Sequence, residues 1–181
     1  MSEFEYLAVF VSMIFGISVT HVLAGIIRSV YRGESNQTHL VFTAFFFFVA
    51  ILNWWTAYSW HDVDVWSFDS FLIIIIWSIS HYVAAITLYP PQSTGSEEPF
   101  EYQQNWFLWA FVGILITEVL QTAARGDVFT PWYYLPFVAH YLAITLIAII
   151  VNKAKLDRWV AWYLLCSITT WAFVVRRFLI E

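Results

Sequence analysis

Two apolar segments of the chain each carry an ionisable side chain well inside a run of helix length. "GISVTHVLAGIIR", residues 16–28, contains His21, and "GILITEVLQTAAR", residues 113–125, contains Glu118. A charge at the centre of a bilayer costs roughly 2.5–3.5 kcal/mol, so such residues usually face the interior of a helix bundle and mark a pathway or binding site. His21 and Glu118 are therefore the first candidates for function.

Further polar residues extend each position into a stripe, because residues three, four and seven positions apart share one face of a helix. The first stripe contains Ser18, His21, Gly25 and Arg28, and the second contains Glu118, Gln121, Thr122 and Arg125. An imidazole titrates near neutral pH, and a carboxyl group is either negative or protonated. We therefore expect the two stripes to line or gate a path for an ion or small solute.

Each of these residues also has a purely structural interpretation. Glu118 can form a buried hydrogen bond that fixes helix register, and His21 can be held by packing and hydrogen bonds alone. Arg28 and Arg125 stand near helix ends, where long basic side chains reach the lipid headgroups. The sequence leaves both interpretations open.

Other candidates lie in the remaining apolar segments. His81 and His140 also fall inside predicted membrane spans, and Trp77 and Trp171 fall in the middle of two of them. Mid-span tryptophans pack a core or gate a pore. Together with His21, the two further histidines suggest a bis-histidine haem, which needs ligands from facing helices. No spacing demands a cofactor, so none is predicted.

The sequence argues against most kinds of catalysis. It contains no glycine-rich phosphate loop, no HExxH or GxSxG motif and no cysteine pair, because Cys166 is its one cysteine. No lysine lies within a predicted span, which argues against a retinal-type Schiff base. Intramembrane hydrolysis needs two carboxylates or a nucleophile with a base, and Glu118 is the one acid deep in a span. We therefore predict no enzyme and no metal site.

The composition explains why these residues must be judged in a membrane. Hydrophobic residues make up 61% of the 181 and charged residues 12%, whereas a soluble domain has about 25% charged residues. The lipid bilayer is therefore part of the solvent of this chain. The net charge of −5 and the lack of a basic stripe argue against a nucleic-acid partner.

Six stretches are long and apolar enough for spanning helices, which need roughly 20 predominantly apolar residues. They lie at about 5–29, 39–60, 68–89, 103–124, 132–152 and 159–179. Tryptophans and tyrosines concentrate near their ends, at the level that these side chains favour. The sequence thus predicts an all-α integral membrane protein with one six-helix transmembrane domain, residues 1–181.

The two polar stripes also indicate an internal repeat. Aligning Gly16 with Gly113 pairs Thr20 with Thr117 and places an arginine at position 28 opposite one at position 125. The predicted halves are about 1–89 and 102–181, joined by a linker at about 90–101. Because each half has three helices, the second half would be inverted, as in many transporters. This 3+3 arrangement requires the first and fourth helices to pack near each other.

Basic residues give the predicted orientation. One side of the membrane receives Arg28, Arg32, Lys153, Lys155 and Arg158, and the other receives Arg125, Arg176 and Arg177. The positive-inside rule then places both termini outside. We expect a multi-pass protein of a bacterial inner membrane. Apolar segments such as "AFFFFVA", residues 44–50, would meet lipid, a second copy of the chain or another membrane protein.

Three functional hypotheses follow. The first is a channel or transporter for an ion or small solute, with the polar stripes on its path. The second is a non-catalytic membrane subunit or sensor that binds a partner protein or lipid, in which Glu118 serves assembly. The third is an electron-transfer subunit with haem held by His21, His81 or His140.

Overall fold

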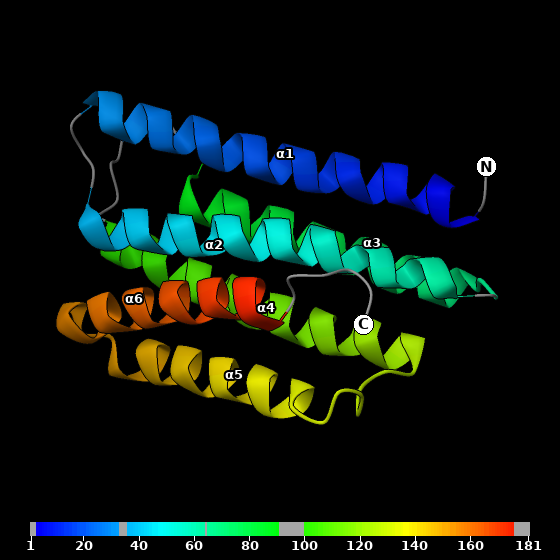
Figure 1. The fold of residues 1–181 in the computed structure, drawn as a ribbon. Helices are drawn as coiled ribbons and strands as arrows, with labels where there is room; N and C mark the ends of the chain where they lie inside the picture. Colours follow the sequence, from blue (N-terminus) through cyan, green and yellow to red (C-terminus); the bar gives the residue numbers. More distant parts are fainter. Residues whose placement is uncertain (1–2, 33–35, 64, 91–99, 176–181) are drawn as a thin grey trace.

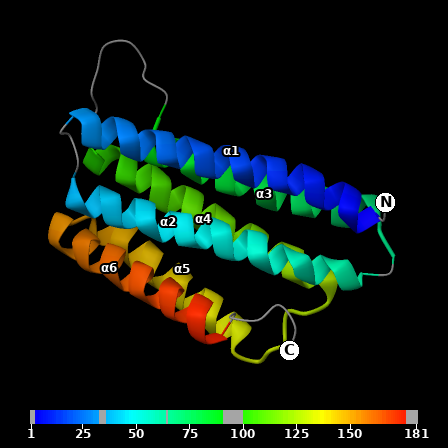
Figure 2. The same ribbon diagram turned by 45° about the horizontal axis from the view of Figure 1, so that its top comes forward.

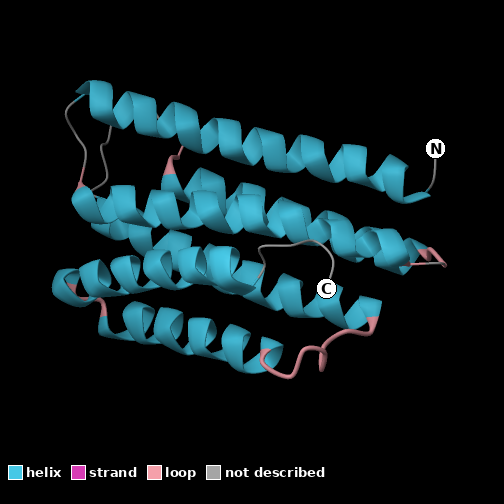
Figure 3. Cartoon of the chain, in the orientation of Figure 1, coloured by secondary structure: helices cyan, strands magenta, loops and turns pink. Residues whose placement is uncertain are grey.

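The structure is a computed structural model that describes residues 3–32, 36–63, 65–90 and 100–175, with no side-chain description at 100–103 and 175. All regular structure in these ranges is helical (Figure 3). The six main helices are α1 (Glu3–Arg32), α2 (Gln37–Thr56), α3 (Phe68–Leu88), α4 (Phe100–Arg125), α5 (Tyr134–Val151) and α6 (Ala154–Thr170). A 3-10 helix, η1 (Ala57–Asp62), continues α2, and a π-helix, η2 (Trp171–Val175), continues α6.

The helices run side by side in alternating directions (Figures 1 and 2). Helix α3 packs along α4 on one side and α1 on the other, and α2 packs along α6 and α1. We call the end where α1 and α3 finish and α2 and α4 begin the Tyr89 end. The opposite end, with η1 and the connection from α4 to α5, is the Trp60 end.

Five helical segments are long and apolar enough to cross a membrane: Glu3–Arg32, Gln37–Asp62, Phe68–Leu88, Gln104–Arg125 and Tyr134–Val151. This agrees with an integral membrane protein. Large apolar side chains cover much of the outer surface, for example Met13 at 61% exposure and Ile27 at 68%. The sixth predicted span does not meet the same criterion, because α6 has 17 residues and three charged side chains near its start, Lys155, Asp157 and Arg158.

Local signals set several helix boundaries. Asn36 precedes α2 and accepts a hydrogen bond from the Thr38 amide at 2.8 Å, as N-cap residues do. Asn152 has a left-handed backbone, φ 44°, and ends α5. Pro136 lies in the first turn of α5, where its missing N–H removes no helical hydrogen bond.

Aromatic side chains join α2 to α4 in the centre of the bundle. Ring centroids are 5.0 Å apart between Phe45 and Phe111, 5.6 Å between Phe42 and Phe107, and 6.2 Å between Phe46 and Phe107. The prediction that "AFFFFVA" meets lipid or a second subunit is therefore wrong for Phe45 and Phe46, which are fully buried. Neighbouring helices cover this part of α2.

The packing gives no support to the inverted repeat. Helices α1 and α4 lie against different parts of α3, and they form no extended contact with each other in the described residues. Phe15 of α1 instead packs on Trp77 and His81 of α3, with centroids 5.3 and 4.7 Å apart. In an inverted repeat, α4 and α6 would pack together as α1 and α3 do. Helix α4 instead packs along α3 and α5. Most of the proposed linker, 91–99, lies outside the described residues.

Candidate functional site

Glu118 of α4 is the centre of a hydrogen-bond network inside the bundle. The Trp77 indole Nε1 donates to its Oε2 at 2.7 Å, and the Gln121 amide Nε2 donates to its Oε1 at 3.1 Å. Both oxygens of the Glu118 carboxyl group therefore act as acceptors. Trp77 stands close to the middle of the 21-residue helix α3. The carboxylate is thus held far from either end of that helix.

Trp60 of η1 fixes the orientation of Gln121. Its indole Nε1 donates to the Gln121 Oε1 at 2.8 Å. Because an indole N–H only donates, the amide oxygen must face Trp60 and the amide nitrogen must face Glu118. The same nitrogen lies 3.1 Å from the Thr122 hydroxyl, which also accepts from Tyr134 at 3.0 Å. Residues from η1, α3 and α5 therefore all converge on one turn of α4.

Arg125 closes this network at the Trp60 end. Its Nε donates to the Asp127 Oδ2 at 2.6 Å, and its guanidinium also donates to the Ser59 hydroxyl. The guanidinium lies 5.9 Å from the centroid of the Trp60 ring, within the range of a cation–π contact. The Arg125 side chain is only 14% exposed. Arg125 thus has partners at its own helix end, two turns from Glu118.

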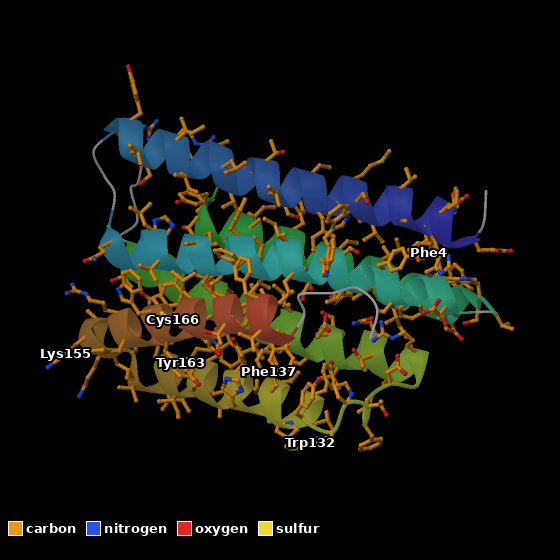
Figure 4. The ribbon with its side chains drawn as sticks, in the orientation of Figure 1. Phe4, Trp132, Phe137, Lys155, Tyr163 and Cys166 are labelled. Atoms are coloured by element: carbon orange, nitrogen blue, oxygen red, sulfur yellow. The ribbon has the colours of Figure 1, made fainter. Side chains whose placement is uncertain are left out.

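A cavity of about 100 Å³ lies beside Glu118, between α2, α4, α5 and the start of η2. On the same measure a single water molecule needs roughly 10–15 Å³, so the cavity holds several waters or one small solute. Its polar lining is supplied by Asn53, Thr56, Ser59, Glu118, Gln121, Thr122, Arg125 and Thr130, and its aromatic lining by Phe111, Tyr134, Phe137, Tyr141 and Trp171. Phe137 is labelled in Figure 4, where it points from α5 towards α6.

Comparison with protein-family models, curated proteins and solved structures gave no significant match. A half-buried carboxylate in a membrane helix, such as that of Glu118, is by default a functional-site hypothesis. The depth, lining and access of this cavity are therefore the properties that bear on function.

His81 stands behind the cavity wall as a neutral imidazole. A carbonyl oxygen only accepts, so the Nδ1 of His81 must donate to the Trp77 carbonyl, 2.9 Å away. Its Nε2 then accepts from the Asn53 amide nitrogen at 2.7 Å. His81 is fully buried. It therefore orients Asn53, a cavity residue, while itself lying outside the cavity.

His21 lies at the Tyr89 end, on a different site from Glu118. Its Nε2 donates to the Tyr89 carbonyl at 2.7 Å, and the Nε2 of His39 donates to the Leu88 carbonyl at 2.9 Å. The last carbonyls of a helix have no partner within it, and donors are favourable there. His21 and His39 thus cap the end of α3, and the structure does not bring His21 into one path with Glu118.

Tyr89 explains two further features of the first stripe. An added Cβ at Gly25 would overlap the Tyr89 ring, so only glycine fits there. Burial raises the pKa of Tyr89, which keeps its hydroxyl protonated. That hydroxyl donates to Thr43 at 3.1 Å, since Thr43 gives its own hydrogen to the His39 carbonyl. The polar spacing on α1 therefore matches a helix cap and a close ring contact.

The remaining candidates have separate places. Arg28 is exposed at the Tyr89 end, and the His140 ring packs 4.4 Å from Tyr141 and 6.2 Å from Tyr163. Trp171 lines the Glu118 cavity and stacks on Phe137 at 3.6 Å. Of the histidines considered for haem, His81 has both ring nitrogens in protein hydrogen bonds and His21 uses its Nε2 on Tyr89.

The sequence did not identify the partners that complete the site. These partners are Trp60, Tyr134 and Asn53. For Trp60 and Asn53, which lie near the end of a predicted span, the sequence favours interfacial anchoring. The neighbours of these residues belong to other helices, so no pattern along their own segments points to Gln121, Thr122 or His81.

Proposed function

We propose that the chain is a small membrane channel or transporter that takes a cation or proton into the Glu118 cavity. The observation that carries the proposal is a carboxylate held by two neutral donors beside a space for a small solute, deep in a membrane bundle. An indole and an amide donate to the two carboxylate oxygens and fix their orientation. Such a group attracts a cation or exchanges a proton.

The lining indicates the side from which a solute enters. The cavity is bordered by buried residues in the bundle, Phe111 and Tyr141, and by exposed residues at the Trp60 end, Ser59 and Thr130. Arg125 stands at this mouth, bonded to Ser59 and Asp127. A solute would enter from the Trp60 end and pass Arg125. The aromatic contacts between α2 and α4 must then open for it to cross.

We also propose that α6, continued by η2, crosses the membrane with the other helices. Helix α6 packs along α2. It therefore covers one side of a helix that lies in the centre of the bundle. The exposed basic residues Arg28, Arg32, Lys153, Lys155 and Arg158 lie at the Tyr89 end. By the positive-inside rule this end faces the cytoplasm and the cavity opens outward.

The test is cation and proton flux into liposomes that contain the purified chain. Glu118→Gln preserves the size of the side chain and removes its charge, and Asp62→Asn removes an 89% exposed acid at the same end of the bundle. We expect flux from the original chain and from Asp62→Asn, and at least a tenfold loss in Glu118→Gln. Equal flux from all three proteins would remove Glu118 from the path.

A second function is favoured by the completeness of the hydrogen bonding around Glu118. A carboxylate with donors on both oxygens also serves as a register lock between α3 and α4. In that case the chain is a non-catalytic subunit or sensor that binds a partner protein or lipid. Folded protein without flux for any cation tested, together with a less stable Glu118→Gln variant, would favour this alternative.

A further inference from the structure

A second hollow, of about 270 Å³, lies between α1, the end of α2 and η1, at the Trp60 end of the bundle. We call it the α1–η1 groove. Its floor consists of four buried apolar side chains, Leu7, Val11, Trp60 and Ile74. Its rim includes three exposed aromatic side chains, Trp54, Trp55 and Tyr58. The groove therefore opens on the outer surface, and none of the described residues that line it is charged.

The α1–η1 groove has the direction and depth of one leaflet of a bilayer. Along α1 it extends from Phe4 to Ser12, eight residues on, which is about 12 Å at 1.5 Å per residue. A hydrocarbon core about 30 Å thick gives each leaflet about 15 Å. Both α1 and the segment from α2 through η1 are long and apolar enough to cross a membrane. The groove thus runs alongside the acyl chains of the leaflet at the Trp60 end.

The volume of the groove suits a lipid chain better than a helix. On this measure one water molecule needs roughly 10–15 Å³, so 270 Å³ corresponds to roughly 20 water molecules, or about 600 Å³ of liquid water. A methylene group is similar in size to a water molecule, so the space is close to that of one acyl chain. One turn of an α-helix, about 10 Å wide and 5.4 Å high, takes about 400 Å³. A partner helix would fit for little more than one turn.

Several polar atoms of the lining already have protein partners. The Trp54 Nε1 donates to the Ser12 hydroxyl at 3.0 Å and joins α2 to α1. The Trp60 Nε1 donates to Gln121 of the Glu118 network at 2.8 Å. A buried water needs two to four polar partners, which the floor of the groove does not supply. Phe4, labelled in Figure 4, packs edge-on against Tyr58, with ring centroids 6.0 Å apart, at the start of α1.

We propose that the α1–η1 groove holds one acyl chain of a phospholipid from the leaflet at the Trp60 end, as a resident lipid distinct from the exchanging lipids around the protein. The chain lies against Leu7, Val11 and Trp60. This site is separate from the Glu118 cavity and does not rest on the proposed function. It borders the cavity network through Trp60, whose indole orients Gln121.

The test is photolabelling of the full chain in phosphatidylcholine nanodiscs. The probe is a phosphatidylcholine with a diazirine in one acyl chain, added at low mole fraction, and the labelled peptides are mapped by mass spectrometry. We expect residues 4–12 and 54–60 to take up at least fivefold more label than residues 17–27 of α1, which include the exposed side chains Ile17 and Ile27. Equal labelling of the groove and of residues 17–27 would overturn the proposal.

Substitutions of Ala8, a small residue of the lining, fill the groove in two steps. Ala8→Phe should reduce labelling of the groove at least fivefold and Ala8→Leu at least twofold. Ala24→Phe, at an exposed position of the same helix, is the control and should leave it unchanged. Unchanged labelling in folded Ala8→Phe overturns the proposal, and Ala8→Leu decides in the same way if Ala8→Phe does not fold.

Occupation by a second copy of the chain is tested with Tyr58→Cys at the rim. The exposed native cysteine is first removed by Cys166→Ala. We expect no disulfide-linked dimer from Tyr58→Cys in this background. A linked dimer whose groove takes up no label would place a second chain there and overturn the proposal.

Discussion

Alanine at Gly25 should destabilise the chain through the Tyr89 ring. The Cβ of an alanine would lie 2.5 Å from Cδ1 and Cδ2 of Tyr89, whereas carbon atoms in contact prefer about 3.5–4.0 Å. The ring or α1 must therefore shift by about 1 Å. Tyr89 is held in place at two points. Its side-chain hydroxyl donates to Thr43, and its backbone carbonyl accepts from His21.

The size of the effect follows from two opposing contributions. Forcing an extra methyl group into a packed site costs about 1–3 kcal/mol. Replacing glycine by alanine inside a helix returns about 0.5–1 kcal/mol of helix stability. The net expectation for Gly25→Ala is a loss in the free energy of unfolding that lies between about 0 and 2.5 kcal/mol, with a central value of about 1 kcal/mol.

Gly16 on the same helix is the matched control. No heavy atom lies within 4 Å of a Cβ added there, so Gly16→Ala should keep the gain of about 0.5–1 kcal/mol. The assay is unfolding by sodium dodecyl sulfate in mixed micelles, followed by circular dichroism. Opposite signs for the two variants are predicted. If Gly25→Ala is as stable as Gly16→Ala, the packing of α1 on Tyr89 is not as described.

Three more substitutions test the network in the same unfolding assay. Trp60→Phe removes the donor that orients Gln121. It should lower the free energy of unfolding by about 1–3 kcal/mol, because a buried acceptor is left without its donor. An unchanged unfolding midpoint would contradict that orientation. Asn53→Leu leaves a buried nitrogen of His81 without its hydrogen-bond partner and should lower the free energy of unfolding by about 1–3 kcal/mol. Asn53→Asp should be measured alongside it. His21→Ala removes one cap of α3 and should cost about 0.5–1.5 kcal/mol while leaving Glu118-dependent flux intact; loss of flux would return His21 to the path.

The sequence predicted the helices well because hydropathy and capping act locally. The predicted span at 68–89 agrees with Phe68–Leu88, and 103–124 agrees with Phe100–Arg125 to within three residues. The residues of the second stripe also lie together in the structure. Glu118, Gln121 and Arg125 share one helix face, and the structure places all three on one cavity.

Tertiary packing decided what the sequence left open. His21 and Glu118 occupy aligned positions in similar segments, yet one caps α3 and the other faces a cavity. Helical periodicity gives the face of a polar residue but not the helix that lies opposite. Where a helix is apolar all round, as at Phe45 and Phe46, hydropathy does not even distinguish lipid from core. Only the packing of α2 against its neighbours shows that both rings are buried.

The central claim is that a solute reaches Glu118, and flux into liposomes tests it most directly. The chain and its Glu118→Gln variant should be reconstituted at equal folded amounts, with Asp62→Asn as the control. The account predicts cation or proton flux that Glu118→Gln reduces at least tenfold and Asp62→Asn leaves unchanged. Flux that Glu118→Gln leaves unchanged, or its absence for every cation from folded protein, would contradict it.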